Sequence, residues 1–435
     1  MVNNSFYSCI MCGCHLRFRY QCGFFDIPVS VYCPNCHTHI YGTINLESLP
    51  NGEHINNAII QPQFEDGYKI ELSTEFVVKK CEKNNNGIYD LTPFLRNNPC
   101  DEARTKRRND LIRFASHAKE YKEIIGNIFN LLKTNNPQLL KQYLKNHSNP
   151  FIDYFKESAP LDSIQNQFDA LMATKHYMTA FLRRTMLPSI SDKVNQVMKI
   201  IDPLFRQKFE AILCFLKYSS KSGYFDIYYS KIPEFIIAYI EVIYQLIPLY
   251  DIYQEFDSVD QTINGITTLS VEDMETLYAK GYELLGESVD LLFGLHNIES
   301  YGSYDNFGNG RDGFYKKMTS YSSKYLKYQD LSTINNKYTE GLLGVLDNII
   351  RNSIAHNSIE IDGLNQIITF IDKHKEKRKE LKLSFLDFGK RCIDLYFSIL
   401  IIWEYYYQLL KYKLMMIDKC SPNYVIAVKQ NNCFQ

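Results

Sequence analysis

Three side chains able to do chemistry stand together in IIRNSIAHNS, residues 349–358. Arg351, Asn352 and His356 form an R-N-x-x-x-H pattern, and on a helix Asn352 and His356 would share one face. Arg351 would lie about 140° from His356 around the axis, but its long stem and five donors can reach the same pocket. The segment therefore predicts a site where a guanidinium, an amide and an imidazole converge.

These groups suit cleavage of a phosphodiester by its neighbouring 2′-hydroxyl. A histidine can take the hydroxyl proton or protonate the leaving oxygen, and an arginine can hold the charge that gathers on phosphorus. RNA itself supplies the nucleophile, so this chemistry needs no metal. The structural alternative is that Arg351 and His356 cap carbonyl groups at a helix end or lie in solvent, as such residues commonly do.

A second reactive group lies near the N-terminus. Cys9-x2-Cys12 is followed after twenty residues by Cys33-x2-Cys36. Each C-x-x-C lets two thiolates converge on one ion, and two such turns complete the tetrahedral sulfur shell that zinc prefers. The segment resembles a zinc ribbon, and we expect a structural zinc ion because so small a domain buries little core.

Other residues near these cysteines keep alternatives open. Ligand exchange is feasible with several neighbours, namely Cys14, Cys22, His15, His37 and His39. Arg17, Arg19 and Tyr20 would suit phosphate contact and base stacking, although such residues also decorate ribbons that act only as scaffolds.

Composition limits the class of protein. The chain has 435 residues, 45% of them hydrophobic, and a formal net charge of -1, so a folded protein is expected and any polyanion site must be local. The N-terminus lacks a basic region followed by an apolar one, which favours the cytoplasm. The two most apolar runs, 235–250 and 395–410, are interrupted by polar residues and predict buried core helices, not membrane spans.

The pattern along the chain predicts a mainly α protein. Strands are expected within 68–80, and helices within 110–133, 161–184 and 191–218, with a kink or new start at Asp202–Pro203. The polar stretch 257–270 marks the main domain boundary, and Ser270 and Asp273 resemble a capping box that opens a long amphipathic helix after it. We predict four domains: a zinc ribbon at 1–48, a β-rich connector at 49–100, a helical middle domain at 101–260 and a helical bundle at 265–435.

The elements around the first motif form a recognisable series. A helix with an apolar stripe from Leu342 to Ile354 ends in the motif, and a hairpin around Asp362–Gly363 follows. A basic run at 373–379 comes next, and then a long helix opened by Ser384 and Asp387. Basic runs are usually solvated faces, but this one lies nearer the motif than the run at 104–108 and is the better candidate for contact with an RNA backbone.

This series, over residues 268–418, resembles the HEPN superfamily of RNases, whose R-x(4–6)-H motif is filled here by Arg351, Asn352 and His356. The resemblance implies a HEPN-like helical bundle that dimerises so that two motifs face one cleft. It also implies metal-independent endoribonuclease activity that leaves cyclic phosphate and 5′-hydroxyl ends. Arg351 would stabilise the phosphate, His356 would transfer protons, and Asn352 would orient substrate or histidine.

Zinc-ribbon and helical extensions ahead of such a domain are similar to those of abortive-infection and other antiphage proteins. That likeness implies a toxin that cuts tRNA or another cellular RNA and is controlled by a regulatory protein or a phage trigger. Two other functions stay open: a non-catalytic HEPN-like module for RNA binding, protein binding or dimerisation, and a zinc-dependent DNA-binding regulator.

Overall fold

The computed structural model describes residues 2–21, 23, 26–46, 48, 52–83, 91–97, 101–146, 160–308, 313–334, 336–342, 344–374 and 377–424. Cys22 and part of the basic run at 373–379 lie outside them. The chain divides into two compact units, each drawn from three segments. Unit 1 comprises Met1–Lys119, Ala238–Lys280 and Asp347–Asp394, and unit 2 comprises Glu120–Ile237, Gly281–Leu346 and Leu395–Gln435. The prediction of four consecutive domains is not tested by this division and stays a prediction.

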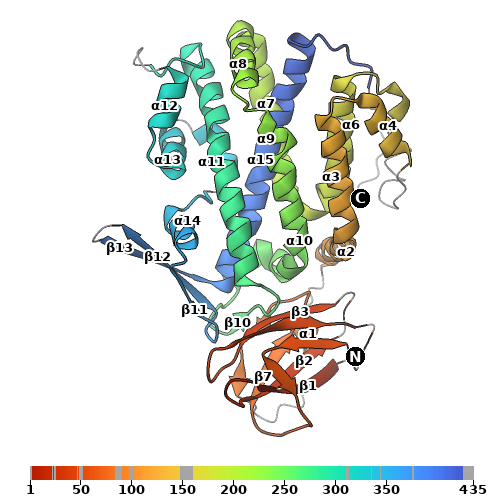
Figure 1. The fold of residues 1–435 in the computed structure, drawn as a ribbon, viewed down its shortest axis with the longest axis vertical. Coiled ribbons are helices and arrows are strands. Elements are labelled where there is room, and N and C mark those ends of the chain that lie inside the picture. Colours follow the sequence, from red (N-terminus) through yellow and green to blue (C-terminus); the bar gives the residue numbers. More distant parts are fainter. Residues whose placement is uncertain are drawn as a thin grey trace. The chain divides into compact units, whose positions relative to one another are not determined.

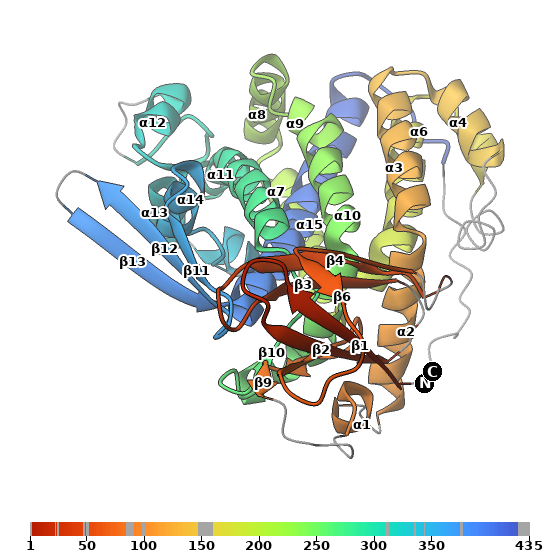
Figure 2. The same cartoon turned by 60° about the horizontal axis from the view of Figure 1, so that its bottom comes forward.

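Small sheets form the N-terminal part of unit 1 (Figure 2). Their strands are β1 Val2–Cys9, β2 His15–Gln21, β3 Ile27–Tyr32, β4 His39–Ile44, β5 Glu53–Asn56, β6 Ala58–Ile60, β7 Tyr68–Leu72, β8 Val78–Lys79, β9 Glu82–Lys83 and β10 Asn264–Gly265. One sheet has the order β6-β1-β2-β7-β9, another has the order β3-β4-β5, and β10 pairs with β8. The strands of the predicted connector thus complete the sheets of the ribbon.

Alternation along the strands builds the core of these sheets. Leu16, Phe18 and Tyr20 of β2 are buried, because every second residue of a strand points to the same face. Val29 and Val31 of β3 are also buried in the same apolar cluster. The cluster fixes the ends of β1 and β3, where the cysteine turns begin.

A separate sheet in unit 1 contains β11 Ile359–Asp362, β12 Ile367–His374 and β13 Lys377–Ser384, paired antiparallel with β12 in the centre (Figure 1). The hairpin predicted around Asp362–Gly363 is confirmed. Strand β13 is not among the predicted elements, because its many charges are typical of a solvated basic run. Its Leu381 and Leu383 nevertheless pair with Phe370 and Ile368, so β13 contributes apolar residues at period two.

The helices of unit 1 are α1 Pro93–Asn97, α2 Glu102–Ser116 and α14 Asn348–Ala355, with η3 Tyr253–Ser258 and parts of three long helices, α10 Lys231–Ile252, α11 Val271–Tyr301 and α15 Phe385–Met416. The predicted starts of α11 and α15 are confirmed. The Ser270 hydroxyl accepts from the Asp273 amide at 3.2 Å, and the Ser384 hydroxyl accepts from the Asp387 amide at 2.9 Å.

The basic run at 104–108 has a structural role in unit 1. Arg104 and Arg108 of α2 lie 3.0 and 3.4 Å from the carboxylate oxygens of Asp251, whose side chain is fully buried. A buried carboxylate needs such partners to offset its loss of hydration. These two arginines therefore anchor α2 to α10.

Unit 2 is helical. Its helices are α3 Ala118–Lys133, α4 Pro137–Asn146, α6 Gln167–Leu182, α7 Pro188–Gln207, α8 Phe209–Lys221, α9 Asp226–Tyr229, α12 Phe314–Ser320 and α13 Lys324–Ile334, with the short 3-10 turns η1 Leu161–Ser163, η2 Arg183–Thr185, η4 Asn336–Tyr338 and η5 Glu340–Leu342. The remaining parts of α10, α11 and α15 also belong to it. At 59% helix, the chain is mainly α, as the sequence predicts.

The sequence predicts a kink or a new start at Asp202–Pro203, and the new start is wrong. Helix α7 continues through Pro203, and α8 begins after Lys208, whose φ of -127° and ψ of 37° are not helical. Tyr412 accounts for this continuity. Its hydroxyl donates to Asp202 at 2.7 Å, and its ring stacks on the Phe205 ring with the centroids 3.7 Å apart. Packing on both sides of the proline holds the helix together.

The helix expected from Leu342 to Ile354 is also shorter than predicted. Gly344 adopts a left-handed φ of +60°, and α14 begins only after Asp347, whose carboxylate accepts from the Ile349 and Ile350 amides at 2.8 and 3.3 Å. The motif thus lies on a short helix with its own N-cap.

One helical stretch, Asp226–Ser258, is long and apolar enough to cross a membrane by length and composition. However, 72% of its most apolar window is buried inside the structure, which is typical of a core helix.

Candidate functional site

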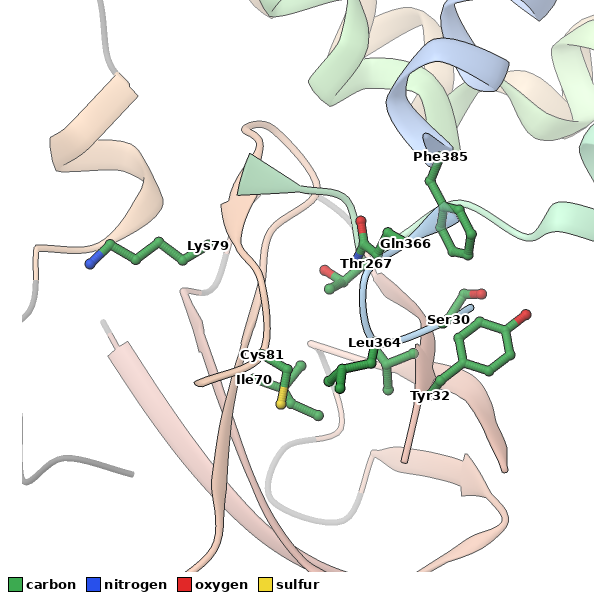
Figure 3. A pocket seen from close by; sticks show the side chains of 11 residues that line it. Ser30, Tyr32, Ile70, Lys79, Cys81, Thr267, Leu364, Gln366 and Phe385 are labelled. Atoms are coloured by element: carbon green, nitrogen blue, oxygen red, sulfur yellow. The ribbon is translucent and has the colours of Figure 1, made fainter. Parts of the chain in front are cut away.

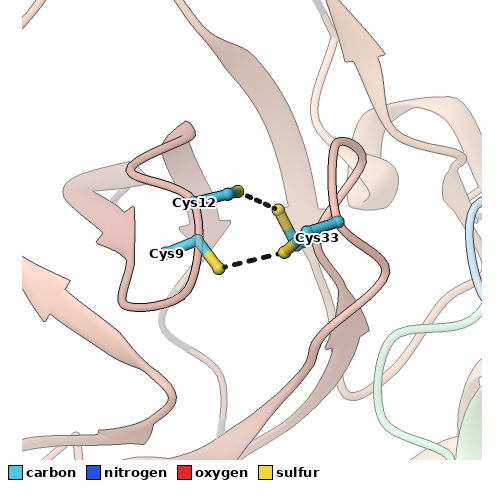
Figure 4. A group of neighbouring side chains, drawn as sticks. Cys9, Cys12 and Cys33 are labelled. Carbon is cyan, nitrogen blue, oxygen red and sulfur yellow. Dashed lines mark hydrogen bonds between the residues drawn. The ribbon is translucent and has the colours of Figure 1, made fainter.

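The four predicted cysteines come together at the ends of two strands. Cys9 ends β1, and Cys33 directly follows β3. The Cys9 and Cys36 sulfurs are 3.6 Å apart, as are those of Cys12 and Cys33, and all four lie within 4.8 Å of one another (Figure 4). These four cysteines are therefore close enough to bind a metal ion.

Tight turns hold this geometry. The Gly13 amide donates to the Cys9 carbonyl and the His37 amide donates to the Cys33 carbonyl, both at 2.9 Å. Gly13 and His37 both have a positive φ, at +69° and +59°. Such turns direct the two thiols of each C-x-x-C towards the same point.

The chemistry of the sulfur cluster fits a metal-thiolate site. A tetrahedral shell with metal–sulfur bonds of about 2.3 Å places its sulfurs about 3.8 Å apart, which is near the two shortest separations seen here. Hydrogen bonds from Thr38 lower the pKa of Cys36 to about 6, which favours its thiolate, whereas burial raises the pKa of Cys33. A bound cation would offset the cost of ionising the buried thiol.

The nearby histidines have other contacts. His15 Nδ1 lies 3.0 Å from an Asp66 oxygen, and His39 Nε2 lies 3.0 Å from the Ser30 hydroxyl. His37 forms the second cysteine turn. Among the residues that the structure describes, the grouping of possible ligands includes only the four cysteines named above.

The residues suggested for phosphate contact on the ribbon are engaged within it. Arg19 Nη1 lies 3.3 Å from the buried Glu71 carboxylate, and the Tyr20 hydroxyl donates to Glu53 at 2.7 Å. Arg17 donates to the Asn4 side chain at 2.9 Å. These contacts stabilise the sheet, so they favour a scaffold role for these residues.

Helix α14 carries the second candidate site. It begins at the Asp347 cap, and Arg391 Nη1 lies 3.5 Å from the other carboxylate oxygen of that cap. The helix ends at His356, whose amide donates to the Asn352 carbonyl at 3.0 Å. His356 is the residue after the last helical one, with a φ of -106° and a ψ of 9°, and it is exposed.

Two of the three motif side chains are in direct contact. Arg351 Nη1 donates to Asn352 Oδ1 at 3.4 Å, and Asn352 Nδ2 donates to Asp372 Oδ2 at 3.1 Å. Arg351, Asn352 and Asp372 are half-buried. In the described part of the chain, the His356 imidazole makes no hydrogen bond with Arg351 or Asn352. The structure therefore brings Arg351 and Asn352 together and leaves His356 exposed at the end of the same helix.

Sequence reasoning missed Asp372. It lies in β12, which packs against α14. The signal that could have found it is the alternation of Ile368, Phe370 and Asp372, which assigns all three residues to one face of the strand. A polar residue that follows two apolar residues on one face of a strand is a candidate partner for polar side chains of the helix packed against that face.

The turn between β11 and β12 contacts the ribbon within unit 1. The Gln366 side chain accepts from the Ile266 amide and donates to the Ile266 carbonyl, both at 2.9 Å. Lys80 Nζ donates to the Asn365 carbonyl at 2.7 Å. Tyr32, which directly precedes Cys33, lies beside this turn (Figure 3). The small cavity here holds about 20 Å³, which is room for about one water molecule and not for an organic ligand.

No family model, no curated protein and no solved structure matches the chain. The function must therefore be argued from the site itself.

Proposed function

We propose that the protein is a metal-independent endoribonuclease of the HEPN type, a toxin-like antiphage effector that cuts tRNA or other cellular RNA in the cytoplasm. The observation that supports this function is the arrangement on α14. Arg351 and Asn352 are in contact within one helical turn, and the His356 imidazole is exposed at the end of that turn. A cation held on a helix that ends in an accessible acid–base group supports such chemistry.

In the proposed reaction the ribose 2′-oxygen attacks the adjacent phosphorus while the bond from phosphorus to the 5′-oxygen breaks. His356 either accepts the 2′-hydroxyl proton or donates a proton to the departing oxygen. Arg351 stabilises the negative charge on the non-bridging oxygens. The products are a 2′,3′-cyclic phosphate and a 5′-hydroxyl.

One histidine cannot be base and acid in the same step. A homodimer that brings two copies of α14 to one cleft supplies both, one neutral and one protonated. The exposure of His356 supports this arrangement, because a second chain or an RNA strand can reach the imidazole. We therefore propose that the active form is a homodimer.

We further propose that the metal of the cysteine cluster is zinc and that its role is structural. Four thiolates complete a tetrahedral shell and leave no position open for substrate. The ion would stabilise the ribbon, while the cleavage chemistry belongs to α14.

The test uses a labelled RNA and the same RNA with a 2′-deoxy substitution at the mapped cut, in buffer without added divalent ions. The wild-type protein should cut only the RNA that keeps its 2′-hydroxyl and should leave cyclic phosphate ends. Arg351→Ala and His356→Ala should each lower the rate by about 100- to 10,000-fold. His54→Ala, which changes an exposed histidine of β5, is the matched control and should cut normally.

Two results would refute the nuclease. One is cleavage of the 2′-deoxy RNA at the wild-type rate, and the other is full activity in both α14 variants. RNA binding without cleavage in the wild type would favour the non-catalytic HEPN-like module instead.

A further inference from the structure

We propose that Asp372 is a positioning residue that orients Arg351 through Asn352, an inference that rests on the ribonuclease proposed above. The three side chains form a series of contacts. The Asn352 amide nitrogen donates to Asp372 at 3.1 Å, and the Asn352 amide oxygen accepts from Arg351 at 3.4 Å.

The chemistry of these partners allows only one orientation of the Asn352 amide. An ionised carboxylate accepts hydrogen bonds, and a guanidinium donates them. The NH₂ group must therefore face Asp372, and the carbonyl oxygen must face Arg351. A reversed amide would place oxygen against oxygen and N–H against N–H. Asp372 thus fixes the acceptor that holds the guanidinium.

Asp372 projects from a packed strand. It lies in β12, the central strand of its sheet, and follows Ile368 and Phe370 on the same face, both of which are fully buried. The Phe370 ring packs on Phe388 with centroids 5.1 Å apart. An anchor on a packed strand is well suited to restrain a long, flexible arginine.

Charge argues against direct contact between Asp372 and substrate. A phosphodiester is an anion, so a nearby carboxylate would repel it. Asp372 instead accepts from Asn352 and lies opposite Lys379 in the register of β12 and β13. Its contact with Asn352 fits a supporting role at the site.

The expected effect of Asp372→Ala is a fall in kcat of about 10- to 100-fold, because small misplacements of a catalytic group carry losses of this size. KM should change by less than about threefold, since long RNA is bound mainly along its backbone. Asp372→Asn keeps an oxygen that can accept from Asn352 and should stay within about threefold of wild type.

A double-mutant cycle tests whether Asp372 acts through Asn352. In an Asn352→Ala background, Asp372→Ala should cause no further loss of kcat, because the group that it orients is already absent. Glu360→Gln is the matched control, since it removes an exposed carboxylate from β11 of the same sheet. Thermal unfolding of every variant, measured in parallel, checks that the loss does not come from unfolding.

Normal kcat in Asp372→Ala would overturn the positioning role, as would equal losses in Asp372→Ala and Asp372→Asn or additive losses in the cycle. These results require a wild type that cleaves and an Arg351→Ala variant that does not, so they leave the proposed nuclease intact. A wild type without cleavage removes the nuclease and, with it, this role of Asp372.

Discussion

Gly363, in the turn between β11 and β12, packs directly against the ring of Tyr32. A Cβ atom placed on Gly363 would lie 1.9 Å from Tyr32 Cγ, which is far inside van der Waals contact. Tyr32 is the residue before Cys33, and strand β12, which follows this turn, carries Asp372. Within unit 1, the cysteine cluster and the motif on α14 are thus linked through packed neighbours.

We predict that Gly363→Ala lowers the free energy of unfolding by about 1–3 kcal/mol, because the added methyl group overpacks this contact. Urea unfolding measures the change. Gly341→Ala is the matched control, since its Cβ would meet only ordinary contacts at 3.6 Å. The loss in a Gly363→Ala, Tyr32→Ala double variant should be smaller than the sum of the single losses. Additive losses would show that the two residues are not packed together.

We predict that the purified protein binds one zinc ion per chain and that Cys33→Ser and Cys36→Ser abolish this binding. Loss of the metal should lower Tm on the order of 10 °C, because metal binding contributes to the folding free energy. Cys14→Ser is the matched control, since Cys14 lies outside the four-sulfur grouping. Elemental analysis and the absorption spectrum of the cobalt-substituted protein give the readout. Equal metal loss in Cys14→Ser would mean that the ligand set is different.

We predict that stability falls between about pH 4.5 and pH 7 through Glu275. Burial, together with the nearby Glu272, raises the pKa of Glu275 to about 7 from an ordinary value of 4.5. Within this window the folded state binds more protons than the unfolded state, so the free energy of unfolding decreases as the pH rises. Because Glu275 is partly exposed, solvent screening limits the effect to about 1–2 kcal/mol.

Urea unfolding at pH 5 and pH 8 measures this slope. Glu275→Gln should reduce the difference in the free energy of unfolding between pH 5 and pH 8 by about 1–2 kcal/mol. It should also make the protein more stable at pH 8, because no carboxylate then has to be ionised in a buried position. Glu272→Gln should reduce the slope only in part, since burial remains. An unchanged slope in Glu275→Gln would contradict the prediction.

Local signals explain which elements the sequence could predict. The Ser270 and Ser384 caps, the hairpin around Gly363 and the four-cysteine grouping each depend on residues close together in the chain. Capping, turn formation and thiolate convergence act over a few residues, so a single sequence reveals them.

The features that the sequence did not predict depend on contacts between residues that are distant in the chain. Tyr412 holds α7 together across Pro203, about two hundred residues away, and Phe370 gives the charged strand β13 an apolar neighbour. Asp372 follows Asn352 by twenty residues and meets it only after β12 packs against α14. A local pattern can at most assign such a residue to one face of a strand and does not identify its distant partner, because tertiary packing overrides propensity there.

Unit 1 has a further consequence for the synthesis of the chain. Strand β8 meets its partner β10 only after residue 265 has been made, and the turn at Gly363 emerges about a hundred residues later. A ribosome carrying the first 119 residues therefore holds a ribbon whose later neighbours do not yet exist. For the proposed toxin, this order of translation delays the complete fold of unit 1 until residue 394 has been made.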